Sequence, residues 1–354
     1  MSDLNLAGTL RKPRRLSPGD RVAAVTPSWG GPGTFPHRYA AGKRQFEEAF
    51  GVTIVEMEHT LADPDWVKRN PRGRAEDLMA AFADPSIAGI IATIGGDDSI
   101  RLLPYLDLDV LRTNPKILLG FSDTTSLHFA CLTAGITSFY GPSVMAGLAE
   151  NGGMHDYTRE SLRRALFDTA PIGSICFNNE GWTSEHLDWS DSSLQSRRRK
   201  MNPASPPKLL QGSGQVSGPL IGGCAEVLEM VKATDWWPRP EQWQGSILFY
   251  ETSEDAPSPN FVRYWLRNFA AQGILQRLSG MIVARPDPAG DPTYGERLHQ
   301  AITAALAEEG LSSLPVLADL DFGHTQPMTT LPFGAMARLD CDARDLVILE
   351  SGVV

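Results

Sequence analysis

Cysteine is scarce in this chain, and its few positions exclude two classes of small protein. Only four of the 354 residues are cysteines. They are widely separated and show neither the paired spacing of a zinc ribbon nor that of a redox motif. We therefore expect no disulfide-stapled scaffold, and the pattern indicates a reducing compartment. The four positions are Cys131, Cys176, Cys224 and Cys341.

Long apolar runs are also lacking. No stretch approaches the ~18 consecutive apolar residues that a membrane-spanning helix needs. The first twenty residues carry basic side chains but no apolar core of the length found in secretory signals. The sequence therefore predicts a cytoplasmic protein without a membrane partner.

Positive charge is in deficit. Lys and Arg number 32 against 42 Asp and Glu, which gives a net charge of −10. Binding to nucleic acid needs clustered basic side chains, so nucleic acid is not an expected partner. The one basic run, at 197–200, lies among Pro, Ser and Asn and is predicted to be a solvated loop.

What the chain does have is a globular composition, with 42% hydrophobic and 21% charged residues. In the first half, short apolar runs alternate with amphipathic ones. Strands are expected at 21–28, 52–57, 87–96 and 116–122, and helices at 38–51, 72–85 and 124–135. This alternation predicts a mostly parallel α/β sheet domain over residues 1–170. Ligands of such sheets bind at the carboxyl ends of the strands.

The rest of the chain divides into two further parts. Residues 171–213 have little periodicity and contain Trp182 and Trp189, which is typical of a linker with a functional loop. Residues 214–354 are predicted to form a second domain that mixes strands and helices. Its expected elements are a strand, a Gly222-Gly223 turn and a helix at 214–234, strands at 245–251, 281–287 and 314–320, helices at 260–280 and 296–310, and a hairpin at 334–351.

A hydroxyl and a carboxylate occupy the strand-to-helix corner in KILLGFSDTTSLHFACLTAG, residues 116–135. Ser122 and Asp123 could cap the following helix, because such side chains accept hydrogen bonds from its first N–H groups. Alternatively, Ser122 is a nucleophile exposed at a sharp turn, although the local sequence is not G-x-S-x-G.

Two further strand ends carry residues that would support a nucleophile. Glu251 ends the apolar strand ILFYE, and His324 lies in a polar loop after a strand. Each could be an ordinary polar residue, and His128 and His155 are rival bases. However, the order Ser, Glu, His suits a triad in which His324 takes the proton of Ser122 and Glu251 orients the imidazole.

A glycine pair follows the strand at 87–96. Gly95 and Gly96 could form a tight turn, cradle a phosphate or contribute an N–H to an oxyanion hole. Two adjacent glycines do not meet the dinucleotide-binding fingerprint. With Ser122 as nucleophile, the N–H of Asp123 would be one oxyanion donor and an N–H of the glycine pair the other.

At these residues the chain resembles the LD-carboxypeptidase family of serine peptidases, and most closely its microcin C immunity branch. The matching stretches are ATIGGDDSIRLLPYLD, NPKILLGFSDTTSL, ITSFYGPSVM, GQVSGPLIGG, ILFYETSED and HTQPMTTLPFG. The resemblance implies an N-terminal α/β domain, a smaller mixed C-terminal domain of β-rich character, an active site between them and a homodimer. It implies no metal and no cofactor.

The resemblance also assigns roles to residues. It implies a nucleophile at Ser122, an acid at Glu251, a general base at His324 and an oxyanion hole near Gly96 and Asp123. Substrate contacts are expected from Gly95, Asp97, Trp189 and Cys224. Trp189 matches a tryptophan that the immunity branch stacks on a nucleobase.

Two substrates are compatible with this resemblance. The immunity branch cleaves the amide bond between a peptidyl or aminoacyl group and a modified nucleotide, whereas the parent activity releases terminal D-alanine from a muropeptide. Trp189 favours the nucleotide substrate. Two departures count against it: Cys224 stands where the immunity branch has an asparagine, and the loop after Glu251 is acidic instead of basic. A non-catalytic ligand-binding protein is the alternative from another class.

Overall fold

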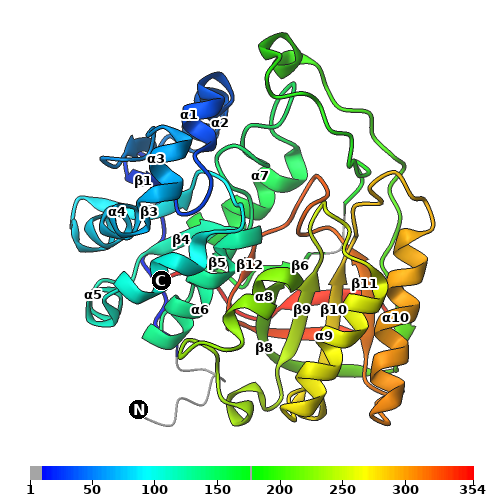
Figure 1. Ribbon diagram of the computed structural model, residues 1–354. Coiled ribbons are helices and arrows are strands. Elements are labelled where there is room, and N and C mark those ends of the chain that lie inside the picture. The colour runs from blue at the N-terminus through cyan, green and yellow to red at the C-terminus, as the bar shows by residue number, and fades with distance from the viewer. Residues whose placement is uncertain (1–9, 176–177) are drawn as a thin grey trace.

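The computed structural model describes residues 10–175 and 178–354, so Cys176 lies outside the described residues. The three described cysteines are free thiols. Two sheets form the molecule, one built mainly from each half of the chain (Figure 1). The predicted class, a mostly parallel α/β domain joined to a mixed β-rich one, is confirmed.

The N-terminal sheet has six strands in the order β12-β5-β4-β3-β1-β2. Neighbouring strands are parallel except for β12, which is antiparallel to β5 and returns from the end of the chain. The strands are β1 (Arg21–Val25), β2 (Thr53–Glu56), β3 (Ile87–Ala92), β4 (Ile117–Gly120), β5 (Phe139–Tyr140) and β12 (Leu331–Pro332).

Helices connect these strands as the alternating pattern predicts. Gly51 ends α2 because its φ of 67° lies in the left-handed region that favours glycine. The helices of this half are α1 (Gly31–Thr34), α2 (Pro36–Phe50), α3 (Pro64–Arg69), α4 (Pro71–Ala83), α5 (Leu108–Thr113), α6 (Thr125–Ala134) and α7 (Asp156–Leu162).

The second sheet has eight strands in the order β6-β14-β13-β8-β9-β10-β11-β7. Its central strands β8 to β11 are parallel and its outer pairs antiparallel. The strands are β6 (Gly173–Ser174), β7 (Lys208–Gln211), β8 (Gln215–Cys224), β9 (Ile247–Glu251), β10 (Gly280–Ala284), β11 (Val316–Leu320), β13 (Met336–Asp340) and β14 (Asp345–Ile348). The helices are α8 (Ala225–Val231), α9 (Pro259–Ala271) and α10 (Tyr294–Glu308).

Two predicted elements of this half are wrong. Gly222 and Gly223 do not form a turn, because β8 continues through them to Cys224 and pairs with β9. A Cβ on Gly222 would lie 1.7 Å from the carbonyl oxygen of Phe249, so glycine serves close strand packing here. The predicted helix at 260–280 ends at Ala271, because the chain turns at Gly273 with a φ of 71°.

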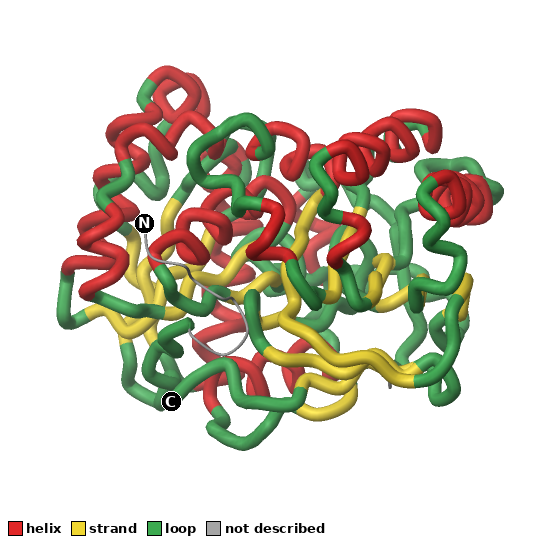
Figure 2. Tube along the Cα trace, turned by 90° about the horizontal axis from the view of Figure 1, so that it is seen from below, coloured by secondary structure: helices red, strands yellow, loops and turns green. Residues whose placement is uncertain are grey.

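A continuous apolar core joins the two sheets. The ring centroids of Tyr140 on β5 and Phe249 on β9 are 5.3 Å apart, and both residues are fully buried. In the view from below, helices lie above both groups of strands, and part of the strand region forms the lower edge of the molecule (Figure 2). This packing brings the carboxyl ends of β4 and β9 close together. None of the helices within residues 10–175 and 178–354 has the length and apolarity to cross a membrane.

Candidate active site

Ser122 occupies a strained turn directly after β4. Its φ of 58° lies in the left-handed region, which non-glycine residues rarely adopt. Its N–H donates to the hydroxyl of Tyr140 at 3.1 Å, and its carbonyl accepts from the hydroxyl of Thr125 at 2.7 Å. No side-chain cap is present at the start of α6. The turn therefore directs the Ser122 hydroxyl away from the helix and toward the second half of the chain.

Three side chains from distant parts of the sequence form one hydrogen-bonded chain. Ser122 Oγ lies 3.1 Å from His324 Nε2, and His324 Nδ1 lies 2.6 Å from Glu251 Oε2. Ser122 follows β4, Glu251 ends β9, and His324 lies in the loop after β11. The structure thus brings together the three residues that the sequence singled out, in the geometry of a nucleophile, a base and an orienting acid.

Glu251 is held in place from both sides. It is 1% exposed, and its second oxygen accepts a hydrogen bond from the hydroxyl of Tyr140. Gly323 precedes the histidine with a φ of 82°, and a Cβ there would lie 2.7 Å from Glu251 Oε2. Only glycine therefore lets the His324 loop approach the carboxylate this closely.

Carboxylates around His324 dominate its ionisation. Burial lowers the pKa of His324, but the charges of Glu251, Glu254 and Glu226 outweigh it and raise the value to about 9. Glu254 lies in the loop after β9, and its Oε2 is 3.1 Å from His324 Nε2, the atom that also faces Ser122. Burial raises the pKa of Glu251, and the charge of His324 opposes that rise.

The glycine pair lies against the Ser122 turn. A Cβ on Gly95 would be 3.1 Å from Ser122 Oγ and 3.5 Å from the backbone nitrogen of Asp123. The Asp123 side chain is buried and accepts from the N–H groups of Asp98 at 2.9 Å and Ser99 at 2.7 Å. Asp123 therefore ties the glycine loop to the serine turn and turns its carboxylate away from the pocket.

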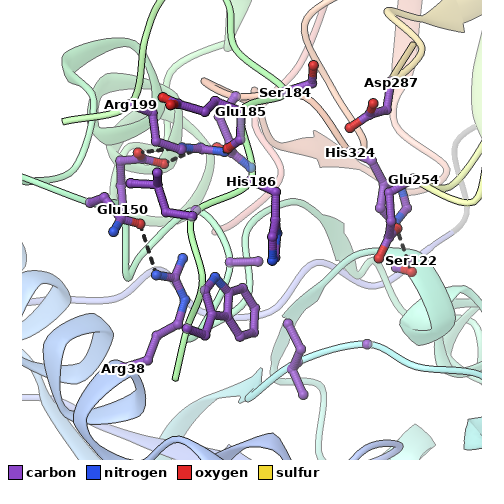
Figure 3. A pocket seen from close by; sticks show the side chains of 18 of the residues that line it. Arg38, Ser122, Glu150, Ser184, Glu185, His186, Arg199, Glu254, Asp287 and His324 are labelled. Atoms are coloured by element: carbon purple, nitrogen blue, oxygen red, sulfur yellow. Dashed lines mark hydrogen bonds and ion pairs between the residues drawn. The ribbon is translucent and has the colours of Figure 1, made fainter. Parts of the chain in front are cut away.

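A pocket of about 770 Å³ opens above these residues, within the size range of small-molecule sites. Ser122, His324, Gly95, Gly96 and Trp189 all line it. Figure 3 shows His324, Glu254 and Ser122 at one end and Arg38, Glu150 and Arg199 at the other.

Aromatic side chains form part of the pocket wall. The Trp189 ring stacks toward that of Trp29, with centroids 6.5 Å apart and planes inclined by 24°. The guanidinium of Arg38 lies 4.1 Å from the centroid of the Trp189 ring, within cation–π distance. The loop before 200 therefore presents Trp189 to the pocket against residues of the N-terminal half.

Comparison with known proteins gives the family. The profile of the LD-carboxypeptidase N-terminal domain matches residues 22–141, and that of the LD-carboxypeptidase C-terminal domain matches residues 217–339. The chain belongs to the LD-carboxypeptidase family. It is accordingly a serine-type carboxypeptidase, a hydrolase.

Its relatives include microcin immunity proteins. The Microcin C7 self-immunity protein MccF of Escherichia coli is 28% identical over 339 residues, which cover 95% of this chain and 94% of MccF. The structure of MccF in complex with aspartyl sulfamoyl adenosine has a TM-score of 0.85 at 28% identity and covers 97% of this chain and 100% of that one. An MccF-like protein from Streptococcus pneumoniae in complex with AMP has a TM-score of 0.82 at 32% identity, over 93% and 98% of the two chains. The predicted resemblance is confirmed.

Not every predicted site residue of this LD-carboxypeptidase lines the pocket. Cys224 is 1% exposed, and its thiol lies 3.3 Å from a carboxylate oxygen of Glu226. Asp97 is exposed but outside the pocket wall. The rival bases lie elsewhere: His128 is buried between Ser138 and the carbonyl of Gly120. His155 Nδ1 is 3.0 Å from Glu180, so neither histidine contacts Ser122.

The basic run at 197–200 is not simply a solvated loop, which corrects the sequence-based expectation. The Arg199 side chain is 15% exposed and forms a two-pronged ion pair with Glu150, whose side chain is 2% exposed. Arg38 lies beside this pair and donates to Asn151 at 3.0 Å. These residues were missed because Arg38 and Arg199 are far apart in the sequence. In the sequence, the basic run at 197–200 is the only feature that draws attention to Arg199.

Proposed function

We propose that this protein hydrolyses the amide bond that joins a peptidyl or aminoacyl group to a modified nucleotide, a microcin C-like substrate. Ser122 is the nucleophile, His324 the general base and Glu251 the acid that orients it. The observation that carries the proposal is the hydrogen-bonded series from Ser122 through His324 to Glu251. Ser122 and His324 line the same pocket as Trp189.

The reaction would run through an acyl-enzyme. Ser122 Oγ attacks the scissile carbonyl carbon while its proton passes to His324 Nε2. The N–H groups of Gly96 and Asp123 would bind the resulting oxyanion. His324 then protonates the leaving nitrogen, and the carbon–nitrogen bond breaks. Water, deprotonated by His324, releases the acyl group from Ser122.

Glu251 and Tyr140 hold His324 and Ser122 in position before substrate binds. Because Glu251 accepts at His324 Nδ1, the other ring nitrogen faces Ser122. Tyr140 bridges Glu251 and the Ser122 backbone, so the acid and the nucleophile are fixed relative to each other.

The nucleotide part of the proposal rests on the aromatic wall. Trp189 lines the pocket, and stacking of a base on an aromatic ring contributes about 1–3 kcal/mol. The likeness to structures that hold AMP or aspartyl sulfamoyl adenosine supports the same substrate class.

A muropeptide tetrapeptide is the second candidate, with terminal D-alanine as the product. It is favoured by the carboxylates of the pocket wall, which disfavour a phosphate-bearing ligand. The wall has five carboxylates, those of Glu150, Glu185, Asp188, Glu254 and Asp287. Its guanidinium groups number two, those of Arg38 and Arg199.

The test is a parallel incubation with an aminoacyl sulfamoyl adenosine and a muramoyl tetrapeptide, with products followed by mass spectrometry. Ser122→Ala is the control for each substrate. Cleavage of the nucleotide analogue alone supports the proposal, and cleavage of the tetrapeptide alone replaces it with the second candidate. If neither substrate is cleaved by the wild type, the substrate class proposed here is wrong.

The proposal includes a cytoplasmic homodimer, which the family resemblance supports. Light scattering on the protein as it elutes from a size-exclusion column should give a mass near twice that of the 38.6 kDa chain. A mass equal to one chain at micromolar concentration would contradict the dimer.

A further inference from the structure

Glu254 occupies a position that interferes with the chemistry proposed for Ser122. Its Oε2 is 3.1 Å from His324 Nε2, and Ser122 Oγ is also 3.1 Å from that atom. One ring nitrogen therefore faces a carboxylate and the nucleophile at the same time. A proton shared with Glu254 leaves Nε2 unable to accept the proton of Ser122.

The loop that carries Glu254 is anchored. Ser253 donates to Glu226 through both its N–H, at 3.0 Å, and its hydroxyl, at 2.6 Å. Ala256 closes the turn with a φ of 45°. Glu254 itself is 67% exposed on its side chain, so its carboxylate is accessible to a ligand group in the pocket.

The surrounding wall is rich in acceptors. Asp287 follows β10 and lines the pocket on the His324 side, where Figure 3 shows it above His324 and Glu254. Gln326 lines the same pocket and is 6% exposed, and its amide oxygen has no hydrogen-bond partner within the described residues. An unsatisfied buried acceptor is costly unless a ligand donates to it. The wall is thus complementary to a ligand group that is positively charged and rich in N–H donors.

We propose that Glu254 is a specificity-determining residue that pairs with His324 in the free site and selects substrates bearing an ammonium or guanidinium group beside the scissile carbonyl. The inference rests on the proposed function, because it takes Ser122 and His324 as nucleophile and base. The incoming cation pairs with Glu254, the Nε2 proton of His324 passes to water, and Nε2 becomes free to accept the proton of Ser122.

The charges that face His324 come from several elements. Glu251 ends β9, Glu254 lies in the loop that follows, Glu226 lies on α8, and Asp287 follows β10. All four are carboxylates, which agrees with the raised pKa of His324. Neutralising Glu254 alone therefore lowers that pKa and leaves the Glu251 contact in place.

The test uses three phosphonate probes of equal size that react with serine and carry a neutral, an ammonium or a carboxylate side group. Labelling rates of Ser122 are measured against pH for the wild type and for Glu254→Gln. Asp255→Asn is the matched control, because Asp255 is the next residue of the same loop, is exposed and lies outside the pocket wall.

Two results are expected. With the neutral probe, Glu254→Gln reacts faster than the wild type at pH 7, by about tenfold for each unit by which the His324 pKa falls. The wild type labels at least fivefold faster, on the order of one ion pair, with the ammonium probe than with the carboxylate probe. Glu254→Gln loses most of that ratio, whereas Asp255→Asn keeps both wild-type properties.

Other outcomes overturn the inference in distinguishable ways. If Ser122 is labelled but Glu254→Gln has the wild-type pH profile and charge preference, the role of Glu254 is wrong and the proposed nucleophile stands. If Asp255→Asn changes the pH profile and the charge preference as much as Glu254→Gln does, the role of Glu254 is again wrong and the proposed nucleophile stands. If no probe labels Ser122 in any variant at any pH, the proposed function fails and this inference with it.

Discussion

The hydroxyl of Tyr140 donates to the carboxylate of Glu251, although Tyr140 belongs to the N-terminal sheet and Glu251 to the C-terminal one. The same hydroxyl accepts the N–H of Ser122 at 3.1 Å. Tyr140 is fully buried. One side chain therefore links the strained serine turn to the carboxylate that contacts His324.

Removing that hydroxyl is expected to affect both stability and rate. Tyr140→Phe leaves the Ser122 N–H and one oxygen of the buried Glu251 carboxylate without that partner, while His324 still contacts the other oxygen. We expect this to cost about 1–3 kcal/mol of unfolding free energy. We expect kcat to fall with little change in KM, because Tyr140 is fully buried and does not line the pocket. Denaturant unfolding and steady-state kinetics measure the two effects.

Tyr250 supplies the matched control for that experiment. It is equally buried, and its hydroxyl has no hydrogen-bond partner among the residues that the structure describes. Tyr250→Phe should therefore leave stability and kcat close to wild type. Equal losses in the two variants would show that the Tyr140 hydroxyl has no special role.

The backbone strain at Ser122 predicts that glycine is tolerated better than alanine at this position. Glycine adopts a φ of 58° without the steric cost that a side chain carries. Ser122→Gly should therefore be more stable than Ser122→Ala by about 1 kcal/mol. Both variants should be inactive. If Ser122→Ala were the more stable of the two in urea unfolding, the strain would not be real.

The ion pair of Arg199 with Glu150 is predicted to be structural. Arg199→Ala leaves the Glu150 carboxylate buried without its partner, at a cost of about 3–5 kcal/mol. Arg197→Ala in the same basic run is the control, because its pair with Glu185 is more exposed and such pairs contribute about 0–1 kcal/mol. Similar melting temperatures for the two variants would contradict this difference.

Trp189 is predicted to act in binding and not in the chemical step. Trp189→Ala should raise KM for an aminoacyl sulfamoyl adenosine by about 5- to 150-fold, equivalent to 1–3 kcal/mol, with kcat nearly unchanged. Trp189→Phe should fall between this variant and wild type, because it keeps an aromatic face. An unchanged KM in Trp189→Ala would mean that the ring only packs against Arg38 and Trp29.

The sequence predicts most of what depends on local patterning. Alternating apolar runs predict β1 to β4 and the helices α2, α4 and α6, whereas the short helices α1, α3 and α5 were not predicted. The strand-end positions of Ser122, Glu251 and His324 indicated the candidate site, because parallel strands bring their carboxyl ends together.

The features that escaped prediction depend on contacts between distant segments. Tyr140 resembles any core residue of a short strand until the second sheet places Glu251 beside it. The glycines at 222 and 223 resemble a turn until the neighbouring strand β9 requires their missing side chains. Arg199 resembles part of a solvated run until the folded loop brings it to Glu150. In each case tertiary packing overrides a local signal.

The most direct measurement of the central claim is the site at which a neutral serine-reactive phosphonate attaches to the intact protein. Peptide mapping by mass spectrometry should find a single adduct on Ser122. It should be absent from Ser122→Ala and slowed by at least about a hundredfold in His324→Ala, because an unassisted hydroxyl is a poor nucleophile. Equal labelling of Ser122→Ala, or labelling of Ser122 that is independent of His324, would contradict the account.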